Sequence, residues 1–131
     1  MSSVLDLCAF EFVITTYSVL RHEAKIFESM LDKSDYGSFT LFGLQWDLVV
    51  LDEAHTICNP HTSTAQAAYM LQTRLKTAIT GTPFQNHYRD VQSLIRFLEI
   101  PPWDDFHYFR KVRYPSLFFL SVYLLTSKAL Y

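Results

Sequence analysis

The stretch "WDLVVLDEAHTIC", residues 46–58, decides the fold, because an apolar run leads directly into a pair of acids. Trp46–Leu51 reads as a strand that is fully apolar at its end, as in a parallel sheet covered on both faces. Asp52 and Glu53 follow at once, and His55 comes two positions later. Since paired carboxylates are costly to bury without partners, either the acids face solvent where the strand ends or they hold something.

The segments around this stretch predict strands that alternate with helices. Strands are expected at Phe10–Thr15 and Thr77–Thr80, which are rich in β-branched residues. Alternation of this kind is typical of an α/β fold with a parallel sheet, whose ligands sit at the carboxyl ends of the strands. Thr15–Thr16, Asp52–Glu53 and Thr80–Thr82 would then share one edge. The expected helices are Tyr17–Leu31, an alanine-rich one after Asn59–Pro60, Arg89–Glu99 and Asp104–Val112.

Two of these helices carry their own boundary signals. Ser63 and Gln66 have the spacing of a capping box, which places a helix start there. In Arg89–Glu99, apolar residues recur at i, i+3, i+4 and i+7, and Pro101–Pro102 stops the helix. The residues of this apolar face are Val91, Leu94, Ile95 and Leu98.

Composition limits the class of protein. The 131 residues fit one domain, and half of them are hydrophobic, which is enough for a core. A net charge of -2 argues against a compact basic DNA-binding module, but not against a larger enzyme with a local DNA groove. Cys8 and Cys58 do not make a disulfide framework, so the cytosol or nucleus is the simplest compartment.

The two acids after the strand also suggest a chemical role. "LDEAH" after an apolar strand, residues 51–55, is the Walker B pattern of nucleotide hydrolases. Asp52 can hold Mg²⁺ directly or through water, because this ion prefers oxygen ligands. Glu53 can orient and polarise the water that attacks the terminal phosphate, and His55 could relay the state of the site. The plainer reading is that an acidic strand end caps the next helix.

Three motifs then follow one another in a familiar order: "VITTYSVL" (residues 13–20), "VVLDEAH" (49–55) and "AITGTPFQN" (78–86). Together they resemble the first RecA-like lobe of the SWI/SNF-type ATPases, helicase-like DNA translocases of superfamily two. The segment "IRFLEIPPW", residues 95–103, is most similar to the helicase-like transcription factor branch with its Rad-type repair translocases. Residues 1–113 are therefore expected to be a partial N-terminal ATPase lobe.

The resemblance implies further site residues, cofactors and partners. A coupling motif, which links hydrolysis to lobe movement, would be formed by Thr80, Gly81, Thr82, Gln85 and Asn86. A segment along the DNA backbone would be formed by Thr15, Thr16 and Tyr17. The implied cofactors are ATP and Mg²⁺, and the implied partner is duplex DNA or chromatin in the nucleus. The implied function is DNA-dependent ATP hydrolysis that drives translocation in chromatin remodelling or DNA repair.

The sequence departs most clearly from the family pattern in two places. It has only three glycines and no G-x-x-x-x-G-K-[ST] segment, so the P-loop strand and its phosphate cradle are missing. We therefore expect a fragment that needs a missing lobe or a partner chain to complete its ATP site, with no useful hydrolysis alone. The apolar residues 114–131 are expected to be a tail that is not family-like, and too short for a confident membrane span.

Two other functions stay open. One is a non-catalytic docking fragment, or pseudo-ATPase, which the missing P-loop favours. The other is a small zinc-binding module, because His55, Cys58 and His61 stand three residues apart and imidazole and thiolate suit Zn²⁺. A structural zinc site needs four ligands, however, and Cys8 lies far upstream.

Overall fold

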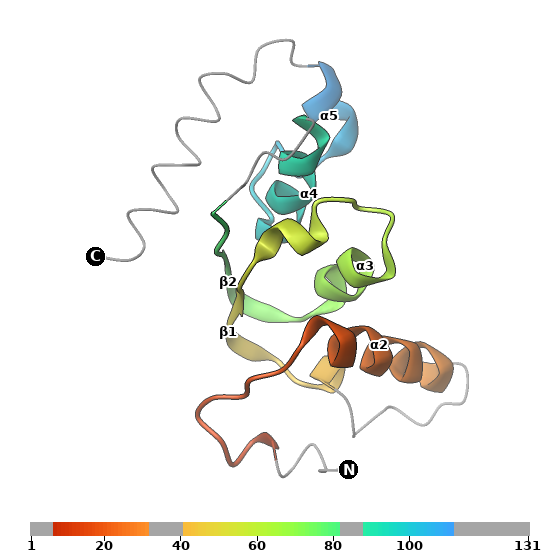
Figure 1. The fold of residues 1–131 in the computed structure, drawn as a ribbon, viewed down its shortest axis with the longest axis vertical. Helices are drawn as coiled ribbons and strands as arrows, with labels where there is room; N and C mark the ends of the chain where they lie inside the picture. Colours follow the sequence, from red (N-terminus) through yellow and green to blue (C-terminus); the bar gives the residue numbers. More distant parts are fainter. Residues whose placement is uncertain (1–6, 32–40, 82–87, 112–131) are drawn as a thin grey trace. The chain divides into compact units, whose positions relative to one another are not determined.

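The computed structural model describes residues 7–31, 41–81 and 88–111 of the chain (Figure 1). The chain divides into two compact units. One is made of Met1–Val49 with Pro60–Leu75, and the other of Val50–Asn59 with Lys76–Tyr131. The elements in chain order are α2 (Tyr17–Leu31), η1 (Leu41–Gly43), β1 (Trp46–Leu51), η2 (Ala54–Ile57), α3 (Ser63–Met70), β2 (Thr73–Ala78), α4 (Tyr88–Leu98) and α5 (Phe106–Lys111).

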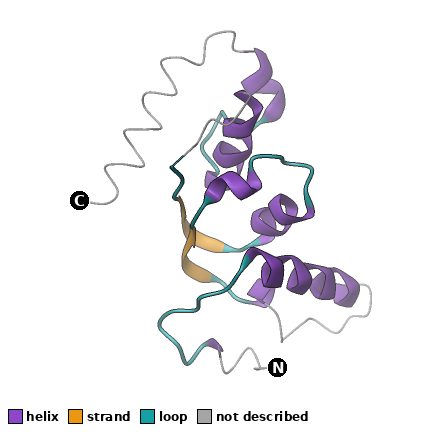
Figure 2. Ribbon diagram, in the orientation of Figure 1, coloured by secondary structure: helices purple, strands orange, loops and turns teal. Residues whose placement is uncertain are grey.

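β1 and β2 form a two-stranded sheet, shown in orange in Figure 2. The strands run parallel: the amide of Trp46 donates to the carbonyl of Gln72 at one end, and the amide of Ile79 donates to that of Leu51 at the other. The predicted α/β fold with parallel strands joined through a helix is thus confirmed. The predicted covering of both faces is not, because Leu48 and Val50 are about half exposed in the described structure.

In the first unit, α2 packs against α3. The helix α2 has the bounds that the sequence predicts, and it buries Leu20 and Ala24 on one face. The helix α3 buries three small side chains, which let neighbouring segments approach its backbone closely. These buried side chains are Ala65, Ala67 and Ala68.

The start of α3 differs from the predicted capping box by one residue. Thr62, in an extended conformation, is the N-cap, and its side chain accepts a hydrogen bond from the amide of Ala65 at 3.2 Å. Gln66 turns away from that role, since its Nε2 donates to the carbonyl of Pro60 at 2.6 Å. The start of the helix is fixed by the residue that adopts the extended conformation, and Ser63 is already helical.

Two strand predictions are wrong, one in the existence of the strand and the other in its bounds. Phe10–Thr15 forms no strand, and the side chains of Phe12 and Ile14 are almost fully exposed, so β propensity alone does not make a strand without a neighbouring strand to pair with. The strand expected at Thr77–Thr80 is β2, which begins at Thr73 and ends at Ala78. Pairing with β1, rather than composition, determines where it lies.

In the second unit, α4 is the central helix. It is buried on almost every side between Val91 and Phe97, with Arg96 as the exception, rather than along one apolar face as predicted. Its end is a Schellman motif: Glu99 has a left-handed φ of 53°, its amide donates to Arg96, and the amide of Ile100 donates to Ile95. Ile100 then packs on a cluster formed by Val91, Ile95 and Phe109.

Within the described ranges, no helix is both long and apolar enough to cross a lipid bilayer. The predicted tail from residue 114 onward, and the boundary before it, lie outside the described residues.

Candidate functional site at the ends of the strands

The chain segments that leave β1 and β2 are tied together within the second unit. The amide of Ile79 donates to the carbonyl of Leu51 at 2.8 Å, and the carbonyl of Ile79 accepts from the amide of Ala54 at 2.9 Å. These two bonds place the pair Asp52–Glu53 next to the backbone that leads into Thr80. Two of the three strand ends expected at one edge of the sheet are therefore neighbours.

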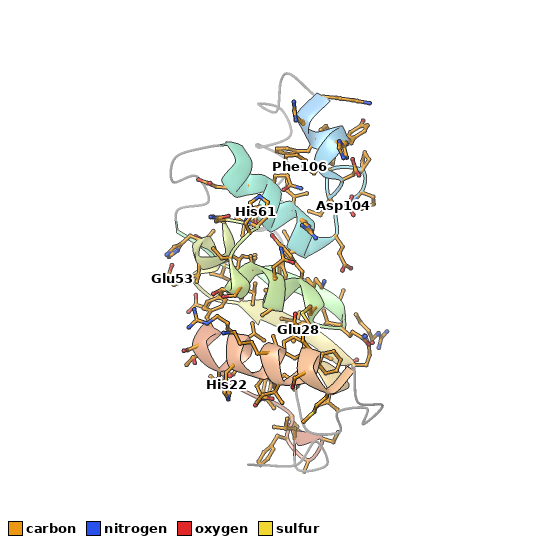
Figure 3. The ribbon with its side chains drawn as sticks, turned by 90° about the vertical axis from the view of Figure 1, so that its right-hand side faces the viewer. His22, Glu28, Glu53, His61, Asp104 and Phe106 are labelled. Atoms are coloured by element: carbon orange, nitrogen blue, oxygen red, sulfur yellow. The ribbon has the colours of Figure 1, made fainter. Side chains whose placement is uncertain are left out.

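The two acids leave the sheet through a strained turn. Glu53 has φ 48° and ψ 48°, a left-handed conformation that is uncommon for residues other than glycine. The turn is held from both sides, because the amide of Glu53 donates to Oδ1 of Asp52 at 2.9 Å while Thr56 donates to the carbonyl of Glu53. As a result both carboxylates are exposed, and Glu53 lies at the outside of the ribbon in Figure 3.

His55 faces the second acid. Its Nδ1 lies 3.1 Å from Oε2 of Glu53, a contact that becomes an ion pair when the imidazole is protonated. Among the described residues, this buried nitrogen has no partner with hydrogen-bonding geometry. The side chain as a whole is one-third exposed. His55 is thus placed to respond to, or orient, the Glu53 carboxylate.

The opposite face of η2 is buried. Residues three apart in a 3₁₀ helix lie on the same side, and here Ala54 and Ile57 both point inward with no exposed surface. The helix α4 packs against this turn, and the hydroxyl of Ser93 donates a hydrogen bond to the carbonyl of Ile57. Sequence reasoning missed Ser93, because it lies outside the apolar face predicted for this helix, in a stretch that also holds Asp90 and Gln92.

Cys58, at the end of η2, is a buried thiol. Burial, together with the nearby carboxylate of Asp90, raises the pKa of the Cys58 thiol from its ordinary value of 9.0 to about 11. The thiol is therefore protonated at neutral pH, whereas a zinc ligand is a thiolate. Within the part of the chain that the structure describes, no three His, Cys, Asp or Glu side chains gather in a way that could hold a metal ion. Nothing described supports the zinc module with His55 and His61.

The predicted coupling motif lies only partly within the described residues. Thr80 is half-buried and Gly81 is exposed, and a Cβ added at Gly81 would meet no described atom within 4 Å. The remaining members of the motif lie outside the described residues; they are Thr82, Gln85 and Asn86. The candidate site as described therefore consists of the turn that carries Asp52 and Glu53, here called the acid turn, and the first two residues of the predicted coupling motif.

The predicted DNA-contacting segment lies at the start of α2 in the first unit, where Tyr17 is the first helical residue, and it follows no strand of the described structure. Thr15 and Thr16 are exposed, and Tyr17 is half-buried. Oγ1 of Thr16 accepts from the amide of Val19 at 3.3 Å, so this threonine caps the helix. Capping is the plainer of the two readings of this segment, and it leaves the Thr15 hydroxyl on the surface.

The acid pair suits Mg²⁺ by the chemistry of its donors. Asp52 and Glu53 offer exposed carboxylate oxygens, which are the hard ligands that this ion takes in proteins, usually while it keeps several waters. Because a nucleotide-bound Mg²⁺ needs only one or two protein carboxylates, the absence of a larger ligand cluster among the described residues does not conflict with such a site.

Comparison with known proteins defines the family. The model of the SNF2-related domain matches residues 3–123, and the chain belongs to this family of helicase-like proteins. It is 33% identical to the DNA repair protein rad5 of Emericella nidulans over 110 residues, which is 84% of this chain and 9% of that protein. It is 38% identical to the DNA repair protein RAD5A of Arabidopsis thaliana over 102 residues, 78% of this chain and 9% of that protein.

A third relative, an ATP-dependent helicase of Schizosaccharomyces pombe, is 35% identical over 113 residues, which cover 81% of this chain and 11% of that protein. The chain thus spans about a tenth of the length of the curated relatives it matches. The resemblance to SWI/SNF-type proteins of the Rad5-type branch is confirmed. The helices and the parallel strand pair are those of part of a RecA-like α/β lobe.

Proposed function

We propose that this chain carries the acid side of the ATP site in a DNA-dependent ATPase that translocates on duplex DNA, in the nucleus, during DNA repair or chromatin remodelling. One observation carries the proposal: Asp52 and Glu53 leave β1 together, exposed, beside the backbone that leads from β2 into Thr80 and Gly81. The names of the relatives, which are repair proteins and an ATP-dependent helicase, supply the substrate and the pathway class.

Each acid has a separate role in this proposal. Asp52 binds the Mg²⁺ that accompanies ATP, either directly or through water. When bound, Mg²⁺ neutralises charge that develops on the phosphates. Glu53 orients the attacking water and accepts its proton, which requires an exposed carboxylate in the position that the turn gives it. His55, whose Nδ1 lies 3.1 Å from that carboxylate, would relay the state of the site.

Two further groups of residues would couple hydrolysis to movement of the lobe and contact DNA. The coupling motif would transmit hydrolysis to lobe movement through the backbone that follows β2; its members are Thr80, Gly81, Thr82, Gln85 and Asn86. The exposed hydroxyl of Thr15 and its neighbours Thr16 and Tyr17 would contact phosphate oxygens of DNA, which position nucleic acid without reading its sequence.

The test is ATP hydrolysis stimulated by duplex DNA, measured on the full-length product that contains this chain. Glu53→Gln should lower the stimulated rate by about 100-fold or more while DNA binding persists, because only the general base is lost. Asp52→Asn should weaken the dependence on Mg²⁺ and ATP. Asp47→Asn is the matched control, since Asp47 is an exposed acid of β1 whose contact is Arg74. An unchanged rate in Glu53→Gln would reject this function and favour the docking alternative.

A further inference from the structure

Ser93 occupies an unusual position for a polar side chain. It lies in the middle of α4, is completely buried, and donates its hydroxyl to the carbonyl of Ile57, the last residue of η2. Buried hydroxyls need hydrogen-bonding partners, and the carbonyl at the end of a short helix needs a donor. One hydrogen bond satisfies both groups across 36 positions of sequence.

This hydrogen bond holds Ile57, at the second end of the turn that carries Asp52 and Glu53. The first end is held by the amide of Ala54, which donates to the carbonyl of Ile79. Between these ends, Thr56 donates both its amide and its hydroxyl to the carbonyl of Glu53, at 3.0 and 2.9 Å. The left-handed backbone of Glu53 is thus connected to Ser93 through only a few residues, each with its own hydrogen bond.

We propose that Ser93 is a positioning residue for Glu53. Its hydroxyl holds η2 in the register that keeps the Glu53 carboxylate aimed out of the sheet. It also joins the acid turn to α4, the helix that follows the coupling motif in the chain, so that α4 and Glu53 keep a fixed relationship. The proposal rests on the proposed function for the role of Glu53, whereas the effect of Ser93 on the shape of the turn does not.

Substitutions at Ser93 can distinguish the loss of its hydroxyl from a change in packing volume. Ser93→Ala keeps nearly the same volume but loses the hydroxyl, which leaves the Ile57 carbonyl without this hydrogen bond. Ser93→Thr keeps the hydroxyl and serves as the conservative variant. Ser29→Ala is the matched control, because the Ser29 hydroxyl also donates to a backbone carbonyl, that of Ile26 at 2.7 Å, but on the exposed surface of α2.

The first experiment records amide resonances of the isotope-labelled chain by nuclear magnetic resonance. Ser93→Ala should shift the signals of Glu53, His55 and Thr56, Ser93→Thr should return them toward the native positions, and Ser29→Ala should leave them unchanged. A folded Ser93→Ala chain with unshifted signals for the turn would overturn the proposal. If Ser93→Ala does not fold, the same comparison is made with Ser93→Cys, whose thiol is a much weaker donor.

The second experiment is a double-mutant cycle on ATP hydrolysis by the full-length product. Ser93→Ala should lower kcat about tenfold with little change in the KM for ATP, because a misplaced base affects the chemical step. In the Glu53→Gln background the same change should have no further effect, since its target is already gone. An equal loss in both backgrounds would overturn the proposal. An unaffected rate in Glu53→Gln itself would reject the proposed function instead, and the resonance shifts then decide the positioning claim alone.

Discussion

Oε2 of Glu53 lies 3.1 Å from Nδ1 of His55, and this contact exists because the Glu53 backbone is left-handed. With φ at 48°, the chain turns sharply after β1, so that two side chains only two positions apart come face to face. A non-glycine residue in this conformation costs about 1–2 kcal/mol. Such strain tends to occur where a side chain is needed at that place, which fits a functional role for Glu53.

Replacing Glu53 should show how much its left-handed backbone lowers the free energy of unfolding. Glu53→Gly should stabilise the fold by up to about 1 kcal/mol, because glycine adopts the left-handed conformation without strain, although its freer unfolded chain offsets part of the gain. Glu53→Gln should leave the free energy of unfolding within about 0.5 kcal/mol, since the side chain is exposed. Urea unfolding measures both values. A Glu53→Gly variant that is less stable than Glu53→Gln would contradict the strain argument.

The two thiols should react at very different rates. Cys8 is exposed, whereas Cys58 is buried with a pKa raised to about 11. At pH 8, a disulfide reagent such as Ellman's reagent should modify one thiol quickly and the other only slowly, and Cys8→Ser should remove the fast phase. Two fast phases in the folded chain would show that η2 does not bury Cys58 as described.

The same thiol makes stability depend on alkaline pH. Because the folded pKa of Cys58 lies above its ordinary value of 9.0, the folded chain binds this proton more tightly than the unfolded chain. The contribution is complete below about pH 9 and is lost as the pH rises toward about 11. Cys58→Ala should flatten this part of the curve of unfolding free energy against pH. An equally steep curve in that variant would assign the loss to other groups.

The N-cap of α3 offers a test between two neighbouring residues. Thr62→Ala should destabilise the first unit by about 1 kcal/mol, because its side chain caps the amide of Ala65. Ser63→Ala should cost less, since Ser63 is already inside the helix, where alanine is favoured. Thermal unfolding followed by circular dichroism compares the two. The reverse order would restore the capping box that the sequence suggests.

Lys76 and Glu99 form an ion pair, and removal of each partner should lower the free energy of unfolding by a different amount. Nζ of Lys76 lies 2.6 Å from Oε1 of Glu99 and 5.3 Å from the centre of the Phe97 ring, and the lysine side chain is only 6% exposed. Glu99→Ala leaves a buried cation with only the ring, and should cost about 2 kcal/mol. Lys76→Met removes that cation and should cost less. Equal losses of unfolding free energy in the two variants would indicate that burial of the cation contributes little.

Local signals predict much of this chain from sequence. The bounds of α2 and β1 match the prediction, because the apolar spacing of the helix and the apolar run at the end of the strand are properties of the segments themselves. The acid turn after β1 is also visible in the sequence, since two adjacent carboxylates cannot continue a buried strand. The family follows from the order of three motifs.

The remaining features depend on contacts between segments that lie far apart in the sequence. The strand expected at Phe10–Thr15 is absent, and β2 begins at Thr73 rather than Thr77, because a strand exists only where a neighbour supplies its hydrogen bonds. Likewise, sequence alone marks Asp52 and Glu53 as a pair of acids. Only tertiary structure decides that Ile79 and Ser93 hold the turn that presents them, since each of these bonds joins residues more than 20 positions apart.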